Sequence, residues 1–283
     1  MLAGPEVPLE DEIGDVLGKA MRGLGLDGEE LARRSGLPAA RVQAALAGAV
    51  EVDDLAPLAA ALELREGALA ELAGPAAPEP PEVNLPEGIV WLNTAHPVPG
   101  YAEMTVNSYL YLPAAEPHAA TAFDTGSEPE QHLSLLRENG RYLSRLFLTH
   151  THHDHICAHD ALVTDDSSVY APQEEPFKGA APVVHQQSFL VAGQRLTALR
   201  TSGHSPGGMS YRLEGPNATV VFVGDAIFCR SIGKVPAAAY KPALRDIAER
   251  LLGLPGDTIL CPGHGPLTTV AFERAHNPFF PSI

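Results

Sequence analysis

The sequence contains few cysteines, and the three present, Cys157, Cys229 and Cys261, are far apart. An odd number of widely spaced cysteines does not suit a disulfide framework, so we expect reduced thiols. No hydrophobic run is long enough to span a bilayer. The first residues lack the basic segment and the apolar core of a signal peptide. These absences favour a cytoplasmic protein with no membrane partner.

Positive charge is also scarce. The 19 Lys and Arg residues stand against 35 Asp and Glu residues, which gives a formal net charge of −16. A chain of this charge repels nucleic acid and anionic membranes, because both are negatively charged. The apolar fraction of 45% is that of an ordinary globular protein, and 283 residues are enough for more than one domain.

Histidine, by contrast, is concentrated in residues 149–155, which read THTHHDH. This stretch follows the apolar run 146–148, which predicts a short buried strand with polar residues at its end. Side chains two apart share a face of an extended chain, so we expect His150 and His152 to point together and His153 to point away. The stretch offers two pairs of metal ligands, His150 with His152 and Asp154 with His155.

Three further ligand-type residues follow predicted strands in the same way. Apolar runs at 195–199, 221–223 and near 260 are followed by His204, Asp225 and His264. A site built along one edge of a sheet requires this repetition. Imidazoles and carboxylates suit zinc, iron or manganese, and one carboxylate can span two ions through its two oxygens. The sequence therefore predicts a site for two divalent metal ions.

The order of these motifs resembles the metallo-β-lactamase superfamily. The resemblance rests on His-x-His-x-Asp-His, Gly-His-Ser-Pro-Gly, Gly-Asp and Pro-Gly-His-Gly-Pro, and it covers roughly residues 89–283. More narrowly, residues 224–234 and 273–280 resemble the glyoxalase II branch in its short bacterial type. The resemblance implies an α/β fold, an αββα sandwich with helices outside two facing sheets. Strands and helices alternate in this part of the sequence, as that fold requires.

The resemblance also implies a role for each ligand. One metal ion would be bound by His150, His152 and His204, and the other by Asp154, His155 and His264. Asp225 would bridge the two ions, and Asp154 and Asp225 are the candidate catalytic residues.

Three other residues match positions of interest in the family. Asp124, in Asp-Thr-Gly, is either a turn residue or a residue that orients a metal-bound histidine. Lys234 matches a lysine that contacts the glutathione moiety in glyoxalase II enzymes, and Arg230 lies in the same loop. A solvated charge or an ion pair is the alternative interpretation of both basic residues.

We therefore predict a dinuclear metal-dependent hydrolase that acts on a small-molecule thioester of the hydroxyacylglutathione type. Two ions about 3.5 to 4 Å apart can hold a bridging hydroxide, because coordination lowers the pKa of water to about 7. The thiolate is a good leaving group. The alternatives are an iron-dependent persulfide dioxygenase, a lactonase, and a DNA-binding regulator whose metal domain senses a metabolite.

Residues 1–74 form a predicted helical domain in which apolar residues recur at helical spacing. It resembles a repressor-type helix-turn-helix domain, with Ala39–Ala47 in the place of the recognition helix. That segment offers only Arg41 and Gln43 as polar contacts, and residues 1–75 carry six Lys and Arg against fourteen Asp and Glu. We therefore expect no nucleic acid partner, and we interpret the domain as a bundle that dimerises or packs on the catalytic domain.

A proline-rich segment over 75–88 predicts an extended linker between this domain and a catalytic domain over 89–283.

Overall fold

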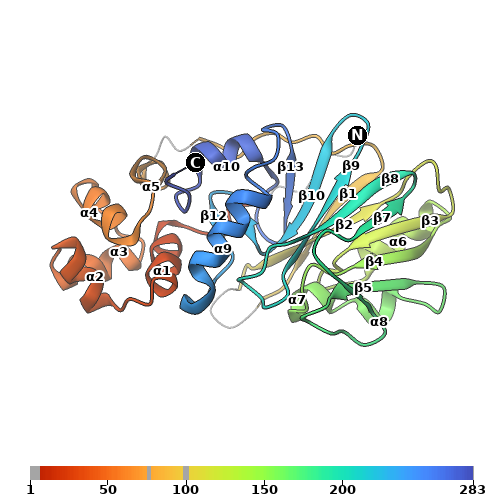
Figure 1. Cartoon of the computed structure of the whole chain (residues 1–283), viewed down its shortest axis with the longest axis horizontal. Coiled ribbons are helices and arrows are strands. Elements are labelled where there is room, and N and C mark those ends of the chain that lie inside the picture. Colours follow the sequence, from red (N-terminus) through yellow and green to blue (C-terminus); the bar gives the residue numbers. More distant parts are fainter. Residues whose placement is uncertain (1–6, 75–77, 98–101, 283) are drawn as a thin grey trace.

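The computed structural model describes residues 7–74, 78–97 and 102–282. Two β-sheets pack face to face, helices cover both outer faces, and a helical bundle lies at one end (Figure 1). In spatial order the first sheet contains β1 (Ile89–Ala95), β2 (Thr105–Tyr111), β3 (Ala119–Phe123), β4 (Tyr142–Phe147), β5 (Ser168–Pro172) and β6 (Ala181–Val183). The second contains β14 (Thr268–Thr269), β13 (Ile259–Pro262), β10 (Thr219–Gly224), β9 (Met209–Glu214), β8 (Gln194–Arg200) and β7 (Ser188–Val191). The predicted αββα sandwich is confirmed.

The helices of the sandwich fall into two sets. Beside the first sheet lie α6 (Glu130–Glu138), α7 (His153–Ile156) and α8 (His159–Leu162). Beside the second lie α9 (Ala237–Arg250) and α10 (Val270–His276), together with the small hairpin of β11 (Ile227–Phe228) and β12 (Ser231–Ile232). Among the described residues, no helix combines the length and the hydrophobicity needed to cross a membrane.

The interior between the two sheets is aromatic close to the point where the ligand loops begin. Phe123, at the end of β3, stacks on Phe222 of β10 with ring centroids 3.6 Å apart. Phe147, the last residue of β4, stacks on Phe123 at 5.7 Å. The Phe123–Phe222 contact joins the two sheets at this end, and the Phe147 ring extends the packed aromatic cluster within the first sheet.

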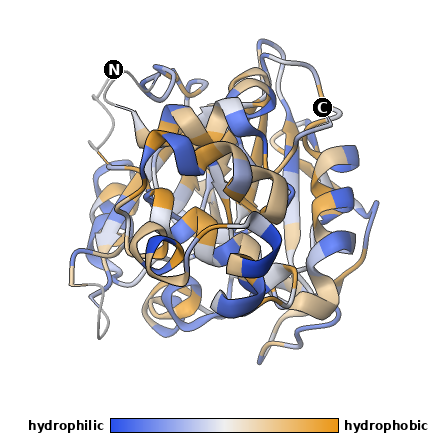
Figure 2. Ribbon diagram, turned by 90° about the vertical axis from the view of Figure 1, so that its left-hand side faces the viewer, coloured by the Kyte–Doolittle hydropathy of each residue, from blue (hydrophilic) through white to orange (hydrophobic). Residues whose placement is uncertain are grey.

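The N-terminal bundle consists of α1 (Ile13–Gly23), α2 (Gly28–Ser35), α3 (Ala39–Leu46), α4 (Val52–Leu62) and α5 (Glu66–Ala73). Asp27 caps α2 by accepting a hydrogen bond from the Glu30 backbone N–H at 2.8 Å, and Gly36 ends the helix in the left-handed conformation, φ 71°. Both features were predicted, and each satisfies backbone groups that the helix ends leave unpaired. Figure 2 views the bundle end-on and shows hydrophobic stretches on its helices beside hydrophilic ones.

The bundle shares one hydrophobic core with the catalytic part of the chain. Leu17 and Leu58 from the bundle belong to the same buried cluster as Val221 of β10 and Ile247 of α9. Polar contacts reinforce it: Arg65 donates from its backbone N–H to the Pro278 carbonyl at 2.8 Å. The bundle therefore packs on the second sheet's helical layer, which is one of the two arrangements expected from the sequence.

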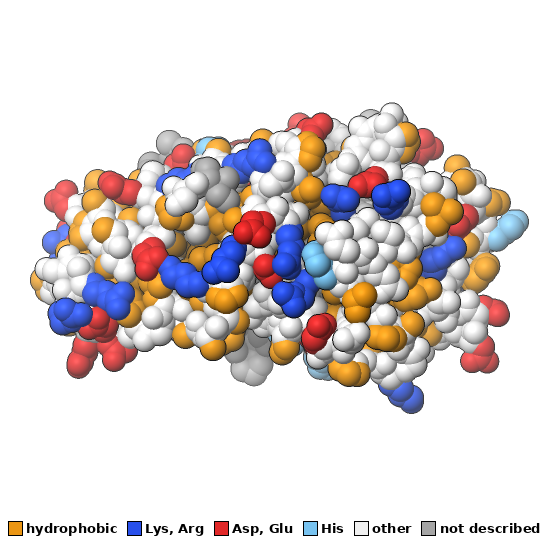
Figure 3. Space-filling model, viewed as in Figure 1, with side chains coloured by type: hydrophobic (Ala, Val, Ile, Leu, Met, Phe, Trp, Pro, Cys, Tyr) orange, Lys and Arg blue, Asp and Glu red, His pale blue; other side chains and the backbone are white. Residues whose placement is uncertain are grey.

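Acidic side chains accompany the basic residue of α3, the helix that would correspond to a recognition helix. Arg41, the only basic residue of α3, is bound to Asp54 at 2.8 Å and Glu51 at 3.1 Å. Lys and Arg side chains lie among Asp and Glu side chains on the face shown in Figure 3. The resemblance to a helix-turn-helix domain stays a prediction, as do the boundaries at 74 and 88.

The predicted linker lies along the sandwich in its described part. Residues 78–86 have no regular secondary structure, and Val83 and Leu85 pack against the core between the sheets. Pro75 lies outside the described residues. The extended segment is thus held in place by apolar contacts rather than free in solvent.

Candidate metal centre

The predicted ligands gather where strands of both sheets end. His150 follows β4 in the first sheet, while His204, Asp225 and His264 follow β8, β10 and β13 in the second. Within the described residues, potential ligand atoms no more than 4.8 Å apart form three groups: His150, His152 and His204; Asp154, His155 and His264; and Asp124, His150 and His155. The first two groups are the two triads predicted from the sequence.

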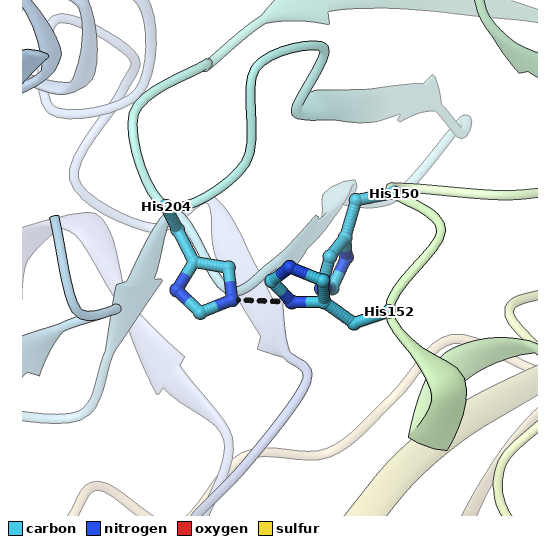
Figure 4. A group of neighbouring side chains, drawn as sticks. All are labelled: His150, His152 and His204. Carbon is cyan, nitrogen blue, oxygen red and sulfur yellow. Dashed lines mark hydrogen bonds between the residues drawn. The ribbon is translucent and has the colours of Figure 1, made fainter. Parts of the chain in front are cut away.

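The first triad joins two loops (Figure 4). Nδ1 of His152 lies 2.9 Å from Nε2 of His204, and the rings of both stand edge-on to His150. The ring of His150 is buried, and its Nε2 has no hydrogen-bond partner. His150 and His152 share a side because the chain between them is extended, as the alternation predicted.

The second triad forms where α7 begins. Oδ2 of Asp154 lies 3.2 Å from Nε2 of His264 and 3.7 Å from Nε2 of His155. The ring of His153, one residue earlier in the same helix, instead contacts the Cys157 thiol, whose Sγ is 3.0 Å from its Nδ1. The helix turn directs neighbouring side chains apart, so His153 stands outside all three ligand groups, as expected.

The carboxylate of Asp225 lies between the two triads. Its Oδ2 is 3.2 Å from Nε2 of His204 and 3.5 Å from Nε2 of His264. Its Oδ1 is 3.3 Å from Nε2 of His155. One carboxylate therefore reaches the coordinating nitrogens of both groups, which is the geometry that a bridging ligand needs.

Hydrogen-bond acceptors lie next to Nδ1 of three of the histidines, on the side of each ring away from the site. Nδ1 of His155 is 2.8 Å from Oδ2 of Asp124, and Nδ1 of His264 is 2.6 Å from the Thr105 carbonyl oxygen. Nδ1 of His204 is 3.1 Å from the carbonyl oxygen of Lys234. Because a carbonyl can only accept, Nδ1 carries the proton there and Nε2 presents a lone pair to the site.

Asp124 orients a second histidine through Thr149. Oδ1 of Asp124 accepts from the Thr149 backbone N–H at 2.7 Å, and Oδ2 accepts from the Thr149 hydroxyl at 2.7 Å. The hydroxyl is thereby free to accept from Nδ1 of His150 at 3.0 Å, which leaves Nε2 of that ring for a metal. This arrangement supports the orienting role predicted for Asp124 over that of a turn residue. The contribution of Thr149 was not anticipated, because nothing in its local sequence distinguishes it.

The electrostatics of the site suit cations. Burial lowers the pKa of His150 well below its usual value, so this imidazole is neutral, as a metal ligand must be. Burial also disfavours charge on His155, but Asp225 and Asp124 outweigh it and raise the pKa to about 10. His155 Nε2 and Asp225 Oδ1 lack hydrogen-bond partners although both are buried. Metal ions would satisfy these atoms and supply the positive charge that the carboxylates attract.

The two basic residues predicted to bind substrate lie in different environments. Lys234 is exposed, and its backbone carbonyl, not its side chain, contacts His204 of the first triad. The side chain of Arg230 is 1% exposed and lies 3.4 Å from the Glu71 carboxylate of α5. Such burial favours the ion-pair interpretation for Arg230, which joins the bundle to the catalytic part.

The N-terminal segment also reaches the site, which no sequence pattern had indicated. Oε2 of Glu10 lies 4.0 Å from Nδ1 of His264. The ammonium of Lys19 stands 4.9 Å above the Phe228 ring and donates to the Ile232 carbonyl at 2.8 Å. Phe228 in turn packs edge-on against His264. Glu10, which precedes α1, and Lys19 of α1, through Phe228, thus lie near the second triad.

The family model of the metallo-beta-lactamase superfamily matches residues 101–264, more than half of the chain. The chain belongs to the metallo-beta-lactamase superfamily. Among curated relatives of this superfamily, a protein of Bacillus subtilis (strain 168) named as a probable metallo-hydrolase is 32% identical over 181 residues, which are 56% of this chain and 85% of the relative. The hydroxyacylglutathione hydrolase of Cronobacter sakazakii is 33% identical over 144 residues, which are 48% of this chain and 54% of that enzyme.

The fold of the chain is also similar to those of solved structures. The BLEG-1 B3 metallo-beta-lactamase is 27% identical with a TM-score of 0.54, and the match covers 68% of this chain and 100% of that one. ETHE1 from Myxococcus xanthus is 26% identical with a TM-score of 0.55, over 67% of this chain and 83% of that one. The matched family region contains all seven predicted ligands and begins after the helical bundle.

Proposed function

We propose that this superfamily member is a dinuclear metal-dependent hydrolase of small-molecule thioesters, of the hydroxyacylglutathione type. The observation that carries the proposal is the position of Asp225, whose two oxygens lie 3.2 Å from His204 and 3.3 Å from His155. Both triads are complete, so the residues present suit two ions sharing one carboxylate. Similarity to metallo-hydrolases and to a hydroxyacylglutathione hydrolase supports hydrolysis and the substrate class respectively.

The residues fit the chemistry of two divalent ions, zinc being the first choice, with iron or manganese as alternatives. His150, His152 and His204 would hold one ion, Asp154, His155 and His264 the other, and Asp225 both. When bound, such a pair makes water nucleophilic near neutral pH and polarises a carbonyl.

The chain's own contribution is to fix the ligands. Hydrogen bonds to Asp124, Thr105 and Lys234 hold the imidazoles in one tautomer and one orientation. Rigid ligands of this kind place the carbonyl of a bound thioester without further reorganisation. A thiolate leaves without strong acid assistance, so the site needs no additional proton donor. The exposed Lys234 ammonium is available for an anionic part of the substrate.

A specific test combines metal analysis with a substrate panel. Protein purified without added metal is assayed for ion content and for release of free thiol from a series of thioesters that includes a hydroxyacylglutathione. We expect about two ions per chain and thiol release that is abolished by a chelator and restored by zinc. A fully metal-loaded protein that leaves every thioester intact would refute the thioesterase proposal.

One alternative is the iron-dependent persulfide dioxygenase already considered from the sequence, which would share this fold. This activity requires a single iron, so one iron per chain with oxygen consumption on glutathione persulfide would identify it. The complete second triad opposes it. Lactones and β-lactams in the same panel test the remaining hydrolase activities.

The bundle does not enter this proposal as a DNA-binding or dimerising module. Its apolar face is used against the catalytic part, and its one recognition-helix arginine is paired. We propose a cytoplasmic enzyme whose partner is its small-molecule substrate.

A further inference from the structure

Glu175 lies outside the metal ligands, in the turn between β5 and β6, and its carboxylate is fully engaged. Oε2 accepts from both the backbone N–H and the hydroxyl of Thr151, each at 2.9 Å. Oε1 accepts from the backbone N–H of Gly207 at 2.7 Å. A carboxylate that accepts several hydrogen bonds in a fixed geometry is a strong local constraint.

The hydrogen-bond partners of Glu175 belong to the two loops that carry the first triad. Thr151 stands between His150 and His152, and Gly207 comes three residues after His204. The same loops are also joined where Met209 donates from its backbone N–H to the Thr149 carbonyl at 2.9 Å. Glu175 adds a second link between these loops, which also carry His152 and His204, whose ring nitrogens are 2.9 Å apart.

The approach of Gly207 to Glu175 leaves little space for a side chain at this position. A Cβ at Gly207 would lie 3.1 Å from Cγ of Glu175 and 3.0 Å from Cβ of Pro172. Burial raises the pKa of Glu175, but the donors of Ser205, Gly207 and Thr151 outweigh it and lower the pKa below its usual value. The group is thus an ionised acceptor seated tightly against both loops.

We propose that Glu175 is a positioning residue that sets the separation of the His150–His152 loop from the His204 loop, and so the affinity of the first metal. It acts through Thr151 and Gly207 and touches neither metal nor substrate. The inference rests on the proposed metal centre but not on the identity of the substrate. Its neighbour Glu174 is exposed, and its carboxylate has no hydrogen bond or ion pair among the described residues, so it provides a matched control.

The test measures metal affinity rather than turnover. In Glu175→Gln the amide nitrogen cannot accept, so a donor of Thr151 or Gly207 loses its partner. We expect the full-length variant, loaded with zinc, to release one of its two ions at about 10 to 100-fold lower chelator concentration, the range typical of outer partners of metal ligands. The Glu174→Gln variant is expected to behave as the wild type. Native mass spectrometry during the chelator titration counts the ions.

Two background variants assign the affected ion. In His264→Ala the first triad remains intact, and there Glu175→Gln is expected to lower the affinity for the remaining ion by the same factor. In His204→Ala, where the second triad remains, it is expected to have no effect. Equal weakening in both backgrounds, or no weakening in either, would overturn the proposal.

A second substitution separates positioning from a general loss of folding. Thr151→Val removes one donor to Glu175 but keeps the backbone N–H, so the fold is preserved while the link is weakened. If the two residues act as one unit, the effect of the double variant on metal affinity will be smaller than the product of the single effects. Independent effects would contradict the proposed linkage, whatever the thioesterase assay shows.

Discussion

The carboxylate of Asp124 lies 2.8 Å from Nδ1 of His155, behind a ring whose Nε2 is 3.3 Å from Asp225. His155 is thus held between two carboxylates, one that orients it and one that would share its metal. The same Asp124 fixes His150 through the Thr149 hydroxyl. Because His150 and His155 belong to different triads, one buried residue controls the orientation of a ligand to each ion.

Asp124→Asn is therefore expected to lower the affinity of the protein for both ions, by about 10 to 100-fold. The amide nitrogen cannot accept from His155 or Thr149, so at least one imidazole loses its fixed tautomer. Chelator competition with the zinc-loaded protein measures the change. The exposed Asp165→Asn is the control for loss of a carboxylate. Affinities unchanged from the wild type would show that Asp124 serves only its turn.

Asp225→Asn is expected to leave about one tightly bound ion per chain. Only one of the two oxygens that face the triads remains in the amide, so the variant cannot bridge. The rate of hydrolysis is expected to fall by more than the roughly 10 to 100-fold typical of substitutions in residues that hydrogen-bond the metal ligands. Metal content and thiol release, measured on the same sample, test this. Two retained ions would refute the bridging role.

The sequence predicted the ligands better than their supports, for a physical reason. Each candidate ligand lies in a loop or a short helix that comes after an apolar strand, so hydrophobic pattern and residue type together locate it. Thr149 and Glu175 act through contacts between loops that only the folded chain brings together, and no local pattern marks them. Arg230 was predicted either to bind substrate or to form an ion pair, and its partner in the folded chain is Glu71, which is 159 residues away.

The helical bundle illustrates the same limit. Its helix bounds follow from apolar spacing and from the cap at Asp27, which are local features. Its docking on α9 depends on which apolar faces remain uncovered once both parts have folded. Periodicity alone does not distinguish a face that meets a second copy from one that meets the same chain.

His132 makes the stability of the protein depend on pH. Burial lowers its pKa to about 4 from an ordinary value of 6.5, and Nδ1 of its ring has no partner. The unfolded chain then binds a proton more readily than the folded one between these values, so stability is present above pH 6.5 and is lost as the pH falls. Between pH 7.5 and pH 5 the loss is about 2 kcal/mol.

His132→Leu is expected to remove this part of the pH dependence. Urea unfolding of wild type and variant at both pH values gives the difference, in which the loss of metal at low pH cancels. His118→Leu, at an exposed position, controls for removal of a histidine. An equal pH dependence in the wild type and His132→Leu would show that burial does not perturb the ring.

Gly23, the last residue of α1, tests the docking of the bundle. A Cβ there would lie 2.3 Å from Cδ2 of the buried Tyr240 ring in α9, so Gly23→Ala forces two helices apart. We expect a loss of about 1 to 3 kcal/mol in the free energy of unfolding. Gly67 in α5 has no atom within 4 Å of the same position. Gly67→Ala should be neutral or stabilising by up to about 1 kcal/mol, since alanine is the better helix former.

Tyr240→Ala provides the room that the added methyl group lacks. In that background the cost of Gly23→Ala is expected to disappear, because the penalty arises from one contact and not from the helix itself. Urea unfolding of the four proteins completes the cycle. A cost that persists without the Tyr240 ring, or a Gly23→Ala variant as stable as Gly67→Ala, would mean that the bundle does not depend on this packing against the catalytic part.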